Sequence, residues 1–316
     1  MLSLAGAFGG LLATAILTLE NFGSTRRWQM IFAIEGIITI CLALISFFTL
    51  TDRPETARWL TEEEKELAIA RVRSERVGTT EVLDKLSSKK VMAGIWNPVT
   101  IASAFVFLLG NVTVQGLAFF VPTIVRTIYP EKSTVAVQLF AVPPYIVGGF
   151  FILLINFLSW KAGRRNLFLI ISAPPIMLGY IIFLATTNPH ARYGATFLIV
   201  AGAFNGGALC NAQVAANVVS DTARSSAIAT NVMFGNIGGL IASWSFLSTD
   251  GPNYYIGNGL NLGTSSIMLV TVILLQIWAT ADNRKRNNKV DTELAELQAS
   301  QVGDLDWKHP EFRWRL

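Results

Sequence analysis

The sequence has little charge, few histidines and no nucleotide-binding motif, and each shortage excludes a class of protein. Asp, Glu, Lys and Arg make up 15% of the 316 residues and apolar residues 52%, which is too little charge for the surface of a soluble domain. His190 and His309 are too few to build a histidine metal cluster, and no Gly-x-x-x-x-Gly-Lys-Ser/Thr phosphate loop is present. We therefore expect no enzyme, no metal site, no cofactor and no ATP-driven pump.

The apolar residues occur in eight long runs with almost no charge. Each run has about 18 to 25 residues, the length of a helix that crosses a hydrocarbon core of about 30 Å. Because every backbone polar group in lipid must be paired within its own segment, the runs predict helices and an all-α polytopic membrane protein. They cover residues 2–19, 28–50, 97–122, 134–158, 166–186, 193–217, 226–248 and 259–281. Cys41 and Cys210 lie inside runs, so no disulfide framework is indicated.

The basic residues are distributed unequally between the two sides of the predicted membrane. Of the 25 Lys and Arg, 20 lie on the side of the 51–96 loop and the C-terminal tail, and five lie on the other side. By the positive-inside rule, this bias predicts that the N- and C-termini are both cytoplasmic. The small positive charge of the chain is therefore explained by its orientation in the membrane. We expect the chain to contact the lipid bilayer and no nucleic acid.

One eight-residue pattern occurs twice, as Gly-Ala-Phe-Gly-Gly-Leu-Leu-Ala at 6–13 and Gly-Asn-Ile-Gly-Gly-Leu-Ile-Ala at 235–242. The copies fall in the first and seventh runs, which have the same direction because six runs separate them. A parallel repeat of six spans is the organisation of major facilitator transporters. The alternative is chance, since small residues four apart, such as Gly6 and Gly10 or Gly235 and Gly239, commonly let membrane helices pack closely.

The repeat also predicts the domain organisation. Residues 51–96 form a long basic loop with a capping box at Thr61–Glu64, as expected of the linker between two six-span halves. Residues 1–50 would then be spans five and six of the N-terminal half, 97–282 a complete C-terminal half of six helices, and 283–316 a cytoplasmic tail. On this hypothesis the chain is a major facilitator fold truncated to eight transmembrane helices, the equivalents of spans 5–12.

Several motifs then identify a family. The patterns Trp-x-x-Ile-Phe-x-Ile-Glu-Gly at 28–36, Pro-Glu-Thr-Ala at 54–57 and Leu-Thr-Glu-Glu-Glu at 60–64 resemble fungal anion:cation symporters, the allantoate permease group of the major facilitator superfamily. Residues 217–224, 235–243, 250–262 and 306–313 resemble later segments of the same group.

This resemblance implies a secondary transporter of a fungal plasma membrane that carries a small carboxylate together with a proton by alternating access. The substrate would be allantoate, ureidosuccinate, nicotinate, pantothenate or a similar anion, and the transporter would be a monomer. The alternative is a truncated, transport-incompetent membrane protein or an incomplete gene model. A membrane enzyme has no candidate catalytic cluster.

Carboxamide side chains in the predicted spans are the candidate substrate-binding groups, because each offers two hydrogen-bond donors and one acceptor to a carboxylate or ureide. The candidates are Asn111, Gln115, Asn205, Asn211 and Asn236. The alternative for each is a structural role, since Asn and Gln in membrane helices often only join neighbouring helices, at about 0.6 kcal/mol per bond.

Two further sets of residues are candidates, one for proton coupling and one for gating in the loops. Glu35 is an acid inside a span and thus a candidate for proton coupling, although a structural bond to a neighbouring helix would also explain it. The superfamily's loop between spans eight and nine carries an Asp-x-x-Gly-Arg-Arg element. Here Gly163, Arg164 and Arg165 match it, but Ser159 to Ala162 supply no acid. Arg224, in the loop between the runs 193–217 and 226–248 on the same side of the membrane, is a further gating candidate.

Overall fold

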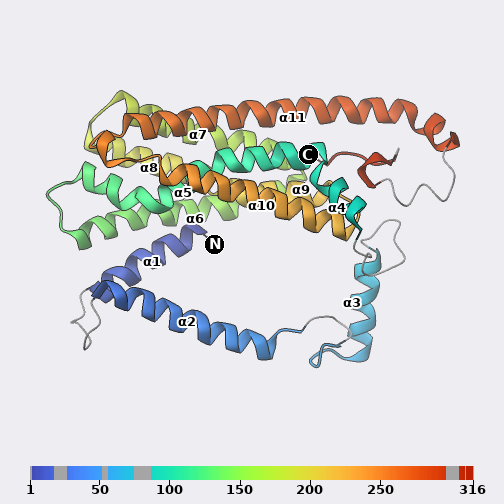
Figure 1. Ribbon diagram of the computed structural model, residues 1–316, viewed down its shortest axis with the longest axis horizontal. Coiled ribbons are helices and arrows are strands. Elements are labelled where there is room, and N and C mark those ends of the chain that lie inside the picture. The colour runs from blue at the N-terminus through green and yellow to red at the C-terminus, as the bar shows by residue number, and fades with distance from the viewer. Residues whose placement is uncertain are drawn as a thin grey trace. The chain divides into compact units, whose positions relative to one another are not determined.

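The computed structural model describes residues 2–17, 27–51, 56–74, 87–296, 306–309 and 311–315. Every regular element in these ranges is a helix (Figure 1). The α-helices are α1 (Leu2–Leu17), α2 (Arg27–Thr49), α3 (Glu62–Ser74), α4 (Ser88–Ile95), α5 (Pro98–Ile128), α6 (Thr134–Ala162), α7 (Arg165–Ala185), α8 (Pro189–Ala203), α9 (Asn205–Ala216), α10 (Asp221–Ser243) and α11 (Tyr255–Glu296). Two short 3₁₀-helices, η2 (Ser248–Asp250) and η3 (Asp306–Lys308), accompany them.

The predicted all-α fold is confirmed, and the eight predicted runs correspond to α1, α2, α5, α6, α7, α8 with α9, α10, and α11. Residues 18 and 19 of the first run, and Pro54 and Glu55 of the linker motif, lie outside the described residues. Among the described residues, six helical stretches are long and apolar enough to cross a membrane: Trp28–Thr49, Pro98–Ile128, Thr134–Ala162, Arg165–Ala185, Pro189–Ala216 and Tyr255–Asn288. The described part of α1 has 16 residues, and α10 contains Ser, Thr and Asn residues that make it more polar than the others.

The chain divides into two compact units, residues 12–84 and residues 1–11 with 85–316. In the smaller unit, α2 has no buried residue along Trp28–Thr49, as expected of a helix that faces lipid. The helix α3 begins with the predicted capping box. The backbone N–H and hydroxyl of Thr61 donate to Glu64 Oε2 at 2.9 and 3.0 Å, and the Glu64 N–H donates to Thr61 Oγ1 at 3.4 Å.

In the larger unit, asparagine–proline pairs begin two of the long helices. Asn97 Oδ1 accepts hydrogen bonds from the N–H groups of Val99 and Thr100, and Pro98 occupies the first helical position of α5. Asn188 and Pro189 begin α8 in the same way. Each pair satisfies backbone donors that a helix start would otherwise leave unpaired, and proline at the first position loses no hydrogen bond.

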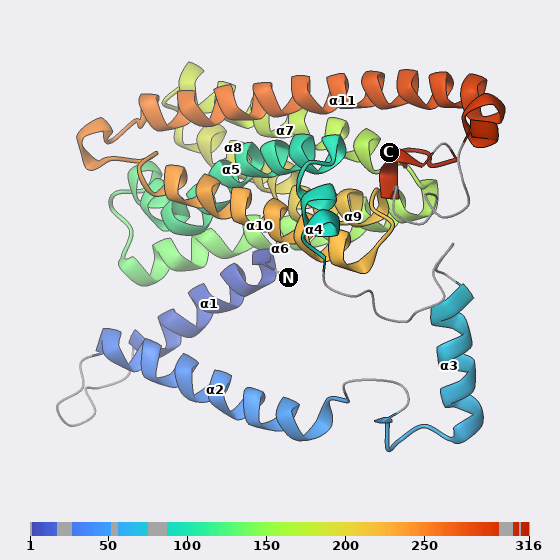
Figure 2. The same ribbon diagram turned by 45° about the vertical axis from the view of Figure 1, so that its right-hand side comes forward.

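The helix α5 is the centre of this unit and contacts α6, α8, α9, α10 and α11 (Figures 1 and 2). The main core contains Leu117 and Val121 of α5, Tyr145 of α6, Tyr180 of α7 and Ile199 of α8. The Tyr145 hydroxyl also donates to the Leu117 carbonyl at 3.1 Å. Because lipid is as apolar as these side chains, close van der Waals packing and such hydrogen bonds hold the helices together.

Glycine allows a close helix contact between α10 and α5. A Cβ atom at Gly238 would overlap the Leu108 carbonyl oxygen, and one at Gly235 would overlap the Phe107 ring. The two helices can therefore approach this closely only while both positions lack a side chain.

We predict that Gly238→Ala destabilises the protein, because the added methyl group meets backbone rather than a flexible side chain. Overpacking of this kind costs about 1–3 kcal/mol, which lowers Tm by several degrees. Gly263→Ala in α11 is the matched control, since a Cβ there has nothing within 4 Å. Thermal unfolding of the purified protein in detergent measures both variants, and an unchanged Tm for Gly238→Ala would contradict this packing.

A second prediction concerns the capping box of α3. The hydrogen bonds from the Thr61 N–H and hydroxyl lower the pKa of Glu64 below its ordinary value of 4.5. A carboxylate with a depressed pKa contributes stability above its unfolded pKa and loses the contribution as the pH falls through the folded value. Glu64→Ala should therefore speed amide exchange in α3 at neutral pH, relative to wild type at the same pH, and the difference should vanish in acid. The exposed neighbour Glu63 gives the control Glu63→Ala, for which no such pH-dependent difference is expected.

Candidate functional site

The candidate carboxamides lie in three different environments of the larger unit. Asn111 is buried, and its Nδ2 donates to the carbonyl of Gly235 at 2.6 Å. This bond joins α5 to α10 at Gly235, whose missing side chain leaves room for the Phe107 ring. The hydrogen-bonding capacity of Asn111 is thus used at least in part between helices.

Gln115 and Asn236 share an open groove between α5 and α10 with a volume of about 860 Å³. Gly239 supports this arrangement, because a Cβ there would lie 3.3 Å from Gln115 Cγ, so the Gln115 side chain lies against the bare glycine backbone. Asn236, one turn before Gly239 on α10, is exposed. The remaining lining residues are Phe119, Ala229, Val232, Met233, Ile237, Leu240 and Ser243. The lining is therefore apolar apart from two carboxamides and one hydroxyl.

Asn205 lies at the junction of α8 and α9, which are separated by Phe204. Its Nδ2 donates to the Ala201 carbonyl at 2.8 Å and to Ser172 Oγ of α7 at 3.2 Å. Among the residues that the structure describes, its buried Oδ1 has no hydrogen-bond partner. Ser172 and Asn111 line a small cavity of about 20 Å³ among α5, α7, α8, α9 and α11. A cavity of this size has room for about one water molecule and not for a metabolite.

Asn211 is occupied by structural bonds. It accepts a hydrogen bond from Asn231 of α10 at 2.8 Å and donates to the Gly207 carbonyl at 2.9 Å. The five candidates therefore do not form one site: Gln115 and Asn236 share the groove, whereas Asn111, Asn205 and Asn211 join helices.

A buried polar pair that the sequence analysis missed joins α5 to α11. Thr113 Oγ1 donates to Asn261 Oδ1 at 2.9 Å, and Asn261 Nδ2 donates to the Gly257 carbonyl at 2.8 Å. Both side chains are buried. The available signal was the presence of Asn261 inside an apolar run, but a partner 148 positions away cannot be identified by helical spacing.

Glu35 lies on α2 in the smaller unit, with an exposed side chain. Thr39 Oγ1 donates to the backbone carbonyl of Glu35 at 2.8 Å. Within the described ranges, the Glu35 carboxylate has no hydrogen-bond partner.

The candidate loop residues lie at the ends of α6, α7 and α10. Gly163 ends α6 with a left-handed φ of 64°, a conformation that glycine adopts without strain. Arg164 is exposed and Arg165 is the first residue of α7; in the part of the chain that the structure describes, neither forms an ion pair. Arg224 donates to the Ala215 carbonyl at 3.2 Å and pairs with Asp221 at 3.3 Å, which fastens the start of α10 to the end of α9.

The first copy of the repeated glycine motif also faces another helix. A Cβ at Gly6 would lie 3.1 Å from the Tyr145 ring of α6, and one at Gly10 would lie 3.6 Å from Gln138 Oε1. In the second copy, Gly235 and Gly238 form the close contact with α5, and Gly239 faces Gln115.

Comparison with known protein families gives the assignment. A sequence model of the Major Facilitator Superfamily matches residues 1–243. The chain belongs to this superfamily. With its membrane-length helices, it is a multi-pass membrane protein.

Fungal transporters are among the similar proteins. The uncharacterized transporter C1039.04 of Schizosaccharomyces pombe is 28% identical over 99% of this chain and 62% of its own length. The uncharacterized transporter C1683.12 of the same yeast is 30% identical over 92% of this chain and 58% of its own length. The MFS-type transporter cnsO of Penicillium expansum is 26% identical over 99% of this chain and 62% of its own length. The chain thus spans about three fifths of the length of these superfamily relatives.

We predict that Asn111 and Gln115 of this superfamily member respond differently to substitution. Asn111→Leu removes the donor to the Gly235 carbonyl and should lower the free energy of unfolding by about 0.6–2 kcal/mol. Gln115→Ala faces the groove and should leave Tm within about one degree of wild type. Thermal unfolding in detergent measures both, and equal losses would contradict the division into structural and groove carboxamides.

Proposed function

We propose that the chain works as a secondary transporter that carries a small organic anion together with a proton across a fungal plasma membrane. The single observation that carries the proposal is the open groove between α5 and α10, in which Gln115, Asn236 and the hydroxyl of Ser243 are the polar groups of an otherwise apolar lining. Superfamily membership and the word transporter in the relatives' names support the general class of activity. The carboxylate substrate and proton symport come from the family resemblance of the motifs at 28–36, 54–57 and 60–64.

The chemistry of the groove suits a substrate with several hydrogen-bonding atoms. Each carboxamide can donate two hydrogen bonds to a carboxylate or accept one from an amide or ureide N–H. Phe119, Val232, Met233 and Leu240 offer apolar contact to the rest of the molecule. Allantoate, ureidosuccinate and pantothenate combine a carboxylate with ureide or amide N–H groups, and nicotinate combines one with an aromatic pyridine ring.

In the proposed mechanism, residues 97–282 form one half of an alternating-access transporter, 1–50 contribute to the other half, and 51–96 connect them. Both termini are placed in the cytoplasm, and the transporter acts as a monomer. Glu35 is the proposed proton-coupling group, and Arg164, Arg165 and Arg224 are the proposed gating charges. Substrate binding from both halves would favour rocking about a central site.

Uptake measurements test the proposal. Yeast that expresses the chain is offered radiolabelled allantoate, ureidosuccinate, nicotinate and pantothenate in turn, and the transported carboxylate should enter faster at external pH 4.5 than at pH 7.5. Gln115→Ala and Asn236→Ala should each raise KM about tenfold or more, as expected for the loss of a hydrogen bond to a charged group. Gln276→Ala on α11, which removes a carboxamide that is not part of the groove lining, is the matched control and should leave KM unchanged.

Surface expression of each variant is measured in parallel. If uptake is present but independent of external pH, proton symport is wrong. If the expressed chain takes up none of the four carboxylates, the transport-incompetent alternative replaces this proposal.

A further inference from the structure

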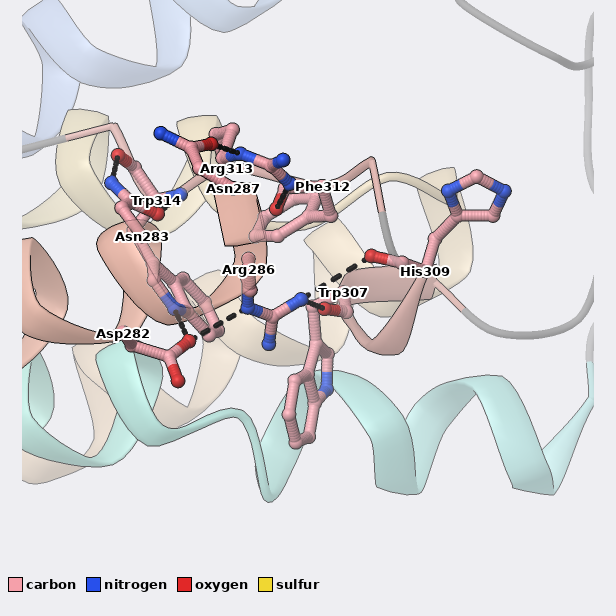
Figure 3. Close-up of polar contacts among 9 residues, drawn as sticks. All are labelled: Asp282, Asn283, Arg286, Asn287, Trp307, His309, Phe312, Arg313 and Trp314. Carbon is pink, nitrogen blue, oxygen red and sulfur yellow. Dashed lines mark hydrogen bonds and ion pairs between the residues drawn. The ribbon is translucent and has the colours of Figure 1, made fainter. Parts of the chain in front are cut away.

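The C-terminal segment 306–315 packs across one end of the larger unit, where α5 and α10 begin and where α9 ends (Figures 1 and 3). The structure describes residues 306–309 and 311–315 of this segment. None of these residues belongs to the proposed transport groove. Their contacts reach four elements that are far apart in the sequence.

The first contact fixes the connection between α9 and α10. Asp306 accepts hydrogen bonds from the backbone N–H groups of Val219 and Ser220, at 3.2 Å to Oδ1 and 3.1 Å to Oδ2. These donors directly precede α10, whose own cap is Ser220. A carboxylate at this position satisfies backbone donors and interacts favourably with the positive end of the helix dipole.

The second contact reaches α4, the last helix before α5. Trp307 Nε1 donates to the Ala93 carbonyl at 3.1 Å. The other face of α4 rests on α10, where Ser226 Oγ donates to the Val91 carbonyl at 3.1 Å and a side chain at Gly94 would overlap the Ala223 carbonyl. The tail and α10 therefore hold α4 from two directions.

The third contact is the buried Trp314, which is 4% exposed and packs with Val99, Leu275 and Ala279. Figure 3 shows its polar partners on α11. Trp314 Nε1 donates to Asp282 Oδ2 at 2.7 Å, and its backbone N–H and carbonyl pair with the Asn283 side chain at 2.9 and 3.0 Å.

Arg286 connects the two tryptophans of the segment. Its Nε pairs with Asp282 at 2.7 Å, and its Nη1 donates to the carbonyls of Trp307 and His309 at 3.2 Å each (Figure 3). The guanidinium carbon lies 5.4 Å from the centre of the Trp314 ring. This cation–π contact and the three hydrogen bonds orient both parts of the tail against α11.

The fourth contact is a chain of buried carboxamides that ends on Arg315. The Arg315 N–H donates to Asn217 Oδ1 at 2.8 Å, and its carbonyl accepts from Asn217 Nδ2 at 2.8 Å and Gln213 Nε2 at 2.9 Å. The Asn217 carbonyl in turn accepts from Nδ2 of Asn97, the residue that caps α5. The tail backbone thus completes hydrogen bonds that extend to the start of the central helix.

We propose that residues 306–315 form a C-terminal latch that fixes α4 and the α9–α10 connection to the ends of α5 and α11. The latch makes the end of the central loop part of the helix bundle, so that any displacement of α4 requires release of Trp307, and any opening of the α9–α10 connection requires release of Asp306. It is a conformational device of this chain and does not depend on which substrate is carried.

Hydrogen–deuterium exchange of the full chain in nanodiscs, without substrate, tests the latch. Asp306→Ala should increase exchange about tenfold or more in the segment 217–222, because two backbone donors lose a charged acceptor. Trp307→Phe keeps an aromatic ring but removes the donor to Ala93, so it should increase exchange in α4 and leave 217–222 less affected. Glu311→Ala, which removes an exposed acid of the same segment, is the matched control and should change neither.

Exchange in residues 106–125 of α5 reports on global folding and should stay unchanged in all three variants. If Asp306→Ala and Trp307→Phe leave both α4 and 217–222 at the wild-type rate, the latch does not hold these elements and the proposal is wrong. A rise confined to the two segments supports it whether or not any carboxylate is transported.

Discussion

The contact of α5 with α10 positions both the buried Asn111 hydrogen bond and the Gln115 groove of the larger unit. It requires bare backbone at Gly235 and Gly238, and this absence of side chains brings the Gly235 carbonyl within reach of Asn111. One turn further along, Gly239 leaves the space beside Gln115 that becomes the groove. The same glycine motif therefore forms a tight helix contact and, directly beside it, an open surface.

Carboxamides take the roles that charged residues have in soluble proteins. Asn97 caps a helix, Asn205 bonds across the break between α8 and α9 to the Ala201 carbonyl, and Asn217 and Gln213 bind the backbone of the tail. An uncharged side chain with both donors and an acceptor can be buried among helices without the desolvation cost of an ion. Charged contacts lie instead at the end of the bundle. There Asp282 and Arg286 of α11 pair with each other and bond to the tail, and Asp306 of the tail accepts from the backbone N–H groups before α10.

Much of the fold was accessible from the sequence, because long apolar runs and the capping box at Thr61 are local signals. The glycine repeat predicted helix contacts but did not distinguish Gly238, which meets backbone, from Gly239, which lines the groove. The interruption at Phe204 was missed although Gly202, Gly206 and Gly207 flank it, because glycine is frequent inside membrane helices and does not by itself indicate a break.

The division of the carboxamides and the role of the tail were also beyond local reasoning. Asn111 and Gln115 lie one turn apart on α5 and look equivalent in sequence, yet a neighbouring helix supplies a carbonyl to one of them and a glycine to the other. The segment 306–313 was notable only as a family motif. Its partners at 93, 219 and 286 are brought to it by folding, and no periodicity in the sequence encodes them.

The length of α11 has a consequence for where the membrane boundary lies. Its 42 residues extend about 63 Å, roughly twice the thickness of the hydrocarbon layer. If about the first 20 residues after Tyr255 fill that layer, Asp282 and Arg286 stand about 10 Å or more beyond it, at the depth of the lipid headgroups. The length of α11 thereby places the Asp282–Arg286 ion pair and the tryptophans that contact it at the membrane–water interface, where tryptophan is enriched in membrane proteins.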